Sequence, residues 1–189
     1  MNWFAALVRI AGSTNPLTAP FVQLQAEIDS RATQGRLRRI EDPVSTLHPD
    51  IREVSGVIYE AVKRTGRAPV KFDDAFYGRY ARSLAILESQ GFIRGQHTIG
   101  EKHLDGFWLD DPHYVVAYLC ALFEDPAKMD RLFQLIDETT PPRWLKGEDI
   151  ALQLDLPLPV VRAVFQLYES RGLGLLSKEL GTANYSCRA

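Results

Sequence analysis

The chain has 189 residues, of which 46% are hydrophobic and 24% are charged, a composition typical of a globular protein that is neither disordered nor fibrous. The formal net charge of −2 excludes a general attraction to nucleic acid or other polyanions. The two cysteines, Cys120 and Cys187, lie far apart in the sequence and indicate neither a disulfide framework nor a zinc site, which favours a reducing, cytoplasmic location.

Residues 1–48 are expected to form a helical N-terminal arm. Residues 2–11 are apolar over much of the predicted helix surface, and two interpretations are open: the helix packs against the body of the protein, or it is a docking or membrane-surface anchor. Arg9 interrupts the apolar run, which argues against a signal peptide, and no stretch of the chain reaches the length of a membrane span. Residues 21–28 predict a second helix, and the basic residues 31–39 mark either a solvated helix end or a phosphate contact.

Residues 49–111 are expected to form a first folded unit. Residues 50–64 place apolar side chains on one face of a helix, and residues 74–90 predict another helix that stops at Gly91. Residues 92–94 and 107–109 resemble two strands joined by a long loop. Residues 112–125 follow as a connector helix, which is apolar nearly all round and should be buried between two units or against the arm.

Residues 126–189 are expected to form a second unit. Helices are predicted at 129–137 and 146–154, with a tight turn at 155–159. From Val160 a third helix runs to a break at Gly172, and strands are predicted at 173–176 and 183–186. The polar residues 178–182 lie between these strands and predict a turn.

Three helices followed by a glycine break and a β-hairpin are similar to the winged helix-turn-helix superfamily, and the resemblance covers residues 126–187. A second copy is indicated because LESQG at 87–91 matches YESRG at 168–172, each closing a helix before apolar strand residues. The predicted fold class is therefore mainly α with small β-hairpins (α+β), as tandem winged-helix domains behind a helical arm. The resemblance implies that the third helix enters the DNA major groove and that the hairpin contacts a neighbouring groove or the backbone.

Catalytic and metal-binding motifs are missing from the sequence. It contains no Gly-rich phosphate loop, nucleophile elbow or HExxH motif, so we expect neither an enzyme nor a cofactor. His97, Glu101 and His103 match no fixed metal-site spacing and are interpreted as solvated loop residues. Acidic pairs beside helix starts and prolines are expected to cap helices.

DNA contacts are predicted in the first unit. Two arginines three residues apart share a face of the helix at 74–90, which corresponds to the third helix of a winged-helix domain, and two further cations lie on its wing. A competing interpretation places the tyrosines in the core and pairs the arginines with nearby acids. The predicted nucleic-acid-binding residues are Arg79, Arg82, Arg94, Lys102 and Tyr77.

The corresponding helix of the second unit begins with Leu158, Pro159 and Arg162, which offer few hydrogen-bond donors, and the unit's charges are balanced. These three residues are the predicted partner-binding site. The sequence thus favours a DNA-binding transcription regulator. The alternative is a protein-interaction adaptor or homodimerisation module that does not bind DNA.

Overall fold

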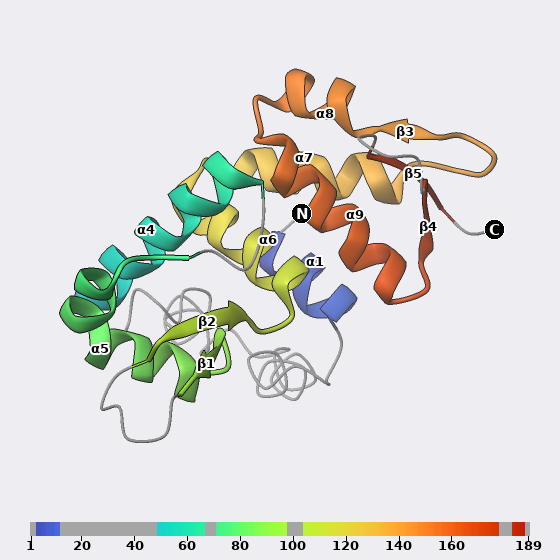
Figure 1. Cartoon of the computed structure of the whole chain (residues 1–189). Helices are drawn as coiled ribbons and strands as arrows, with labels where there is room; N and C mark the ends of the chain where they lie inside the picture. Colours follow the sequence, from blue (N-terminus) through green and yellow to red (C-terminus); the bar gives the residue numbers. More distant parts are fainter. Residues whose placement is uncertain (1–2, 12–48, 67–70, 98–103, 178–182, 188–189) are drawn as a thin grey trace, which may run out of the picture.

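The computed structural model describes residues 3–11, 49–66, 71–97, 104–177 and 183–187. Within these ranges the chain forms seven helices and two small antiparallel sheets, which confirms a mainly α fold with small β-hairpins (Figure 1). No helix in the described ranges is both long and apolar enough to cross a membrane. The elements are, in order, α1 (Trp3–Ala11), α4 (Pro49–Thr65), α5 (Asp74–Ser89), β1 (Ile93–Gln96), β2 (Gly106–Leu109), α6 (Pro112–Phe123), α7 (Pro126–Asp137), β3 (Leu145–Lys146), α8 (Gly147–Leu154), α9 (Leu158–Ser170), β4 (Gly174–Leu176) and β5 (Asn184–Cys187).

Helix α6 lies at the centre of the molecule. Every residue from Tyr114 to Ala121 is buried, and the helix packs against α9, α4, α1 and α7 (Figure 1). Neighbours on several sides explain why the sequence is apolar nearly all round. The prediction of a buried helix at this place is confirmed.

Helix α1 packs its apolar face against α6 and α7. Ala6, Leu7 and Ile10 are buried, and the Trp3 ring lies 6.1 Å from the ring of Tyr118. Of the two interpretations of this segment, the structure supports packing against the body of the protein, because these apolar side chains already have an intramolecular partner. The predicted helix at 21–28 and the basic cluster at 31–39 lie outside the described residues.

A helix, a left-handed glycine and a hairpin occur twice. Helix α5 ends before Gly91, whose φ is +75°, and β1 then pairs with β2 so that Ile93 faces Leu109. Helix α9 ends before Gly172, whose φ is +74°, and β4 then pairs with β5. A positive φ strongly favours glycine, so both glycines occupy the position that ends the helix and turns the chain into a strand. The predicted helix ends and hairpins are confirmed at both places.

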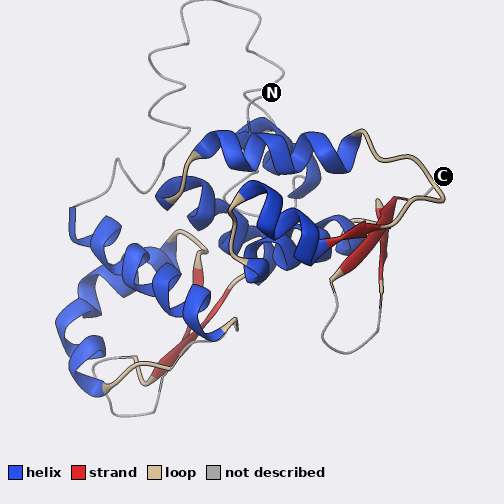
Figure 2. Ribbon diagram, turned by 90° about the horizontal axis from the view of Figure 1, so that it is seen from above, coloured by secondary structure: helices blue, strands red, loops and turns tan. Residues whose placement is uncertain are grey.

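The two sheets differ in size and lie at different ends of the molecule (Figure 2). The first consists of β1 and β2, whereas the second has three strands in the order β3-β5-β4. Strand β3 was not predicted, because it has only two residues and forms through pairing of Leu145 with Tyr185, forty residues later in the chain. Alternating hydrophobicity cannot be recognised in so short a segment.

Candidate functional site

The outward face of α5 is the surface on which the sequence places DNA contacts. The helix packs mainly against α4 and β1. Its inward face is aromatic and aliphatic, with Phe76, Tyr77, Tyr80, Leu84 and Leu87 buried. Its outward face carries small residues and two arginines at helical spacing. The exposed residues of α5 are Asp74, Ala75, Gly78, Arg79, Arg82, Ala85 and Ser89.

Tyr77 lies in the core, so its predicted placement on the DNA-facing surface is wrong. The residue is only 5% exposed, and its ring makes edge contacts with Phe76 and Phe107, at centroid distances of 5.7 and 6.3 Å. The contact of Tyr77 with Phe107 in β2 is a long-range interaction, which the sequence of α5 alone cannot predict. The spacing of the apolar residues in α5 was nevertheless a usable signal, because Tyr77, Leu84 and Leu87 share one helical face.

Arg79 and Arg94 have carboxylate partners. Arg79 Nη2 lies 3.1 Å from Glu53 Oε1, and its guanidinium lies 5.0 Å from the centroid of the Tyr80 ring. Arg94 Nη2 lies 2.6 Å from Asp110 Oδ1. Both arginine side chains remain largely exposed, at 69% and 74%.

Arg82 is exposed and makes no ion pair with any residue that the structure describes. It is therefore the arginine on α5 most readily available to a phosphate or a base. Lys102, the remaining predicted contact, lies outside the described residues.

Acidic residues beside helix starts serve two purposes. Asp73 accepts a hydrogen bond of 2.9 Å from the backbone N–H of Phe76, and Asp125 accepts one of 3.0 Å from Ala127, as expected of helix caps. Asp111 instead pairs with Arg171 at 2.7 Å and makes no capping hydrogen bond. The capping prediction thus holds for Asp73 and Asp125, and the second role, joining elements distant in sequence, was not predicted.

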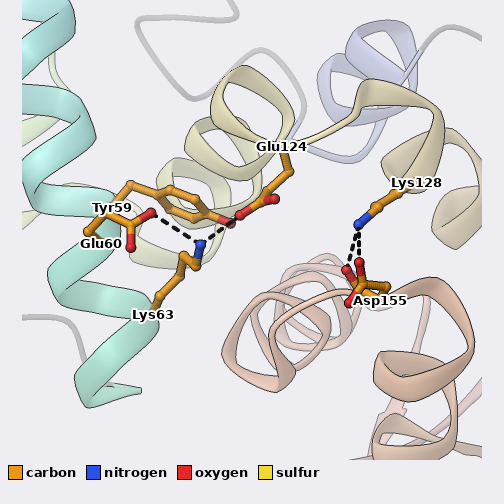
Figure 3. Close-up of polar contacts among 6 residues, drawn as sticks. All are labelled: Tyr59, Glu60, Lys63, Glu124, Lys128 and Asp155. Carbon is orange, nitrogen blue, oxygen red and sulfur yellow. Dashed lines mark hydrogen bonds and ion pairs between the residues drawn. The ribbon is translucent and has the colours of Figure 1, made fainter.

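Polar contacts join α4 to the end of α6 (Figure 3). Lys63 Nζ lies 2.8 Å from Glu124 Oε1 and 3.1 Å from Glu60 Oε1, and the Tyr59 hydroxyl donates to Glu124 at 3.3 Å. The hydrogen bond to Glu124 raises the pKa of Lys63. Burial raises the pKa of the neighbouring Cys120 to about 12, so this cysteine is an unreactive thiol at neutral pH.

A second polar contact joins α7 to the turn between α8 and α9 (Figure 3). Lys128 Nζ lies 2.7 Å from Asp155 Oδ2 and donates to the Asp155 carbonyl at 2.8 Å. Asp155 has a φ of +50°, and its carbonyl is held at the bend between the two helices. The contact therefore stabilises the turn between the two helices, which is shorter than the predicted 155–159 because α9 begins at Leu158.

Helix α9 is packed against more neighbouring helices than α5. It packs extensively on α6 and also contacts α8, α4 and α1. Leu158, Pro159 and Arg162, the predicted partner-binding residues, are half-buried. A Cβ placed on Gly66, just after α4, would lie 3.6 Å from Pro159 Cγ. The end of α4 thus already lies beside this surface, and a protein partner would have to compete with it.

His97, one of the loop residues considered as metal ligands, shows no metal-binding geometry in the described part of the chain. His97 is exposed, and its Nε2 lies 3.4 Å from Glu88 Oε1. Glu101 and His103 lie outside the described residues. Among the residues that are described, no three His, Cys, Asp or Glu side chains come close enough to hold a metal ion.

No family model matches the sequence, and neither the curated proteins nor the solved structures include a significant match.

Proposed function

We propose that the chain is a winged-helix DNA-binding regulator that places α5 of its first unit, residues 49–111, in the major groove. The observation that carries this proposal is the outward face of α5, where Arg79 and Arg82 lie among small residues, with one exposed acid, Asp74, in the first turn. Small side chains let a helix approach the base edges closely, and arginine can donate two hydrogen bonds to guanine or bind a phosphate. Helix α9, its counterpart in the second unit, has its apolar face packed on α6.

The tandem winged-helix organisation is part of the proposal. In the second unit, residues 126–189, the order is helix, short strand, two helices and a hairpin, and the early strand β3 pairs with the last strand β5. This order and pairing support a winged helix. The first unit supplies α4, α5 and the β1–β2 hairpin within its described residues.

The ion pair of Arg79 is compatible with DNA binding. Both of its side chains are more than half exposed, and such a pair contributes only about 0–1 kcal/mol, because water screens both charges. A phosphate can therefore replace Glu53 as the partner at small cost. Since the whole chain carries a net charge of −2, binding must come from this local surface and should weaken steeply with salt.

The double substitution Arg79→Ala and Arg82→Ala tests the proposal. We expect at least a tenfold loss of affinity for mixed genomic fragments at moderate salt, measured by fluorescence anisotropy, because two cationic contacts are removed together. The matched control is Arg131→Ala with Arg143→Ala, which changes net charge equally on exposed residues of the second unit. Absence of salt-dependent binding by the unsubstituted protein at low salt contradicts the proposal, as does an equal loss in the control.

An adaptor or dimerisation function is the second candidate, and the sheet of the second unit favours it. Leu175 in β4 is 49% exposed, and Leu173, the residue just before this strand, is 45% exposed. Trp144, just before β3 at the opposite edge, is 50% exposed. If a second copy of the chain docks here, light scattering after size-exclusion chromatography should show a dimer that Leu175→Glu converts to monomer. A monomer at every concentration excludes the homodimer.

A further inference from the structure

A pocket lies where three helices from different parts of the chain meet. Its volume is about 280 Å³, and its wall comes from the end of α4, the start of α6 and the first half of α9. This volume is near the lower end of ligand sites, which span roughly 300–1,000 Å³. Val62, Val116 and Ala163, one from each helix, form its apolar part.

Three polar side chains complete the wall: His113, Arg162 and Gln166. Within the described ranges, none of the three makes a hydrogen bond or an ion pair with another side chain. All three side chains are half-buried and therefore already partly dehydrated. A ligand that accepts hydrogen bonds from them would remove only the remainder of their hydration. A few polar side chains placed beside an apolar wall are typical of a ligand site.

The charge of the wall is positive. No carboxylate lines the pocket, and Asp111, the nearest acid along the chain, is paired with Arg171 at 2.7 Å. Pro112 and His113 form the first turn of α6, so the positive end of that helix dipole faces the same region. Burial lowers the pKa of His113, and the neutral ring retains one N–H donor.

We propose that this pocket binds a small organic carboxylate with a compact apolar body, and that Arg162 holds the carboxylate. The apolar body contacts Val62, Val116 and Ala163, while His113 and Gln166 are placed to donate further hydrogen bonds. Because the wall includes α4 and α9, such a ligand would join the first unit to the second. This site is independent of the outward face of α5.

Benzoate and benzyl alcohol are suitable probes, because they share an aromatic body and differ in charge. Titrations are followed by NMR chemical shifts of the ¹⁵N-labelled full-length chain. We expect saturable binding of benzoate, at least tenfold weaker binding of benzyl alcohol, and shifts at residues of the three helices that form the wall. Equal binding of the two probes, or no saturable binding of benzoate, overturns the proposal.

Two variants test the wall directly. Arg162→Gln should weaken benzoate binding tenfold or more, whereas Arg131→Gln on the exposed face of α7 should leave it unchanged. Ala163→Leu fills the pocket and should abolish binding while keeping every charge. If Arg162→Gln does not fold, two other variants decide the outcome. Arg162→Lys keeps the charge and should bind benzoate within a few fold of the unsubstituted protein, whereas Ala163→Leu should not bind it. Unchanged affinity in Ala163→Leu overturns the assignment.

Discussion

At the residue scale, Lys63 shows how one side chain can have two carboxylate partners of unequal importance. Glu60 is on the same helix and its side chain is 67% exposed, whereas Glu124 follows α6 and is 23% exposed. A charged hydrogen bond that is partly shielded from water contributes more than an exposed one. Glu124 also accepts from Tyr59, so its removal affects two donors.

Glu124→Gln should therefore lower the free energy of unfolding by about 1–3 kcal/mol, the range for hydrogen bonds to charged groups. Glu60→Gln removes the same charge from the same lysine and should change stability by less than about 0.5 kcal/mol. Urea denaturation at pH 7 measures both. Equal effects of the two substitutions would contradict the unequal roles assigned to these carboxylates.

The same ion pair predicts a pH dependence. The pKa of Lys63 is raised in the folded protein above its ordinary value, mainly by the hydrogen bond to Glu124. Its stabilising contribution is thus fully present below the unfolded pKa and is lost as pH rises through the folded pKa. The stability difference between the unsubstituted protein and Glu124→Gln should be constant from neutral pH to about pH 9 and shrink above about pH 10.5. A difference that grows in alkali would contradict this assignment.

At the scale of elements, the glycines after α5 and α9 both adopt a left-handed backbone conformation. Gly91→Ala or Gly172→Ala should destabilise the protein by about 1–2 kcal/mol, because a left-handed backbone is strained for residues with a Cβ. Gly78→Ala is the control, since a Cβ there meets no atom within 4 Å and the residue lies inside α5. It should stabilise by about 0.5–1 kcal/mol. Thermal unfolding distinguishes the opposite signs.

Helix α6 allows a direct test of its central packing. Leu119 is 3% exposed, and Leu119→Ala should cost about 2–5 kcal/mol and lower the melting temperature by roughly 2–4 °C per kcal/mol. Leu152→Ala makes the same chemical change on α8, where the side chain is 86% exposed, and should stay within about 0.5 kcal/mol. An unchanged melting temperature in Leu119→Ala would show that α6 is not tightly packed.

At the scale of the whole molecule, the two proposed units share one core. A single cluster of buried side chains extends from α4, α5 and the first hairpin through α6 to α7, α9 and the second sheet. Helix α6 contacts α4 on one side of this cluster and α9 on the other. Arg171, just after α9, forms an ion pair with Asp111, just before α6. A shared core of this kind couples the unfolding of its parts.

We therefore expect one cooperative unfolding transition. The chain has three tryptophans, and Trp108 in β2 and Trp144 before β3 report on different ends of the molecule. Variants that keep only one of these two, with Trp3→Phe in both, should give the same urea midpoint by fluorescence. Two separated midpoints would show that the units unfold independently.

The structural features that could be predicted from the sequence are those that depend on residues close together in the chain. Helical spacing of apolar residues predicts α4, α5, α6 and α9, because a helix buries one face or, for α6, nearly all of its surface. Gly91 and Gly172 predict the breaks into the hairpins, because a left-handed backbone favours glycine. These properties depend on residues only a few positions apart.

The tertiary structure decided which surfaces remain open. In sequence, α5 and α9 are equivalent amphipathic helices before a glycine, yet α6 covers α9 and leaves Arg82 of α5 exposed. Tyr77 is buried because Phe107 returns to it from a strand thirty residues later, and β3 exists because Tyr185 pairs with Leu145. The sequence by itself determined where most helices lie and, through Gly91 and Gly172, where α5 and α9 end. Contacts between distant segments determined exposure, because the burial of a residue depends on partners that local periodicity does not specify.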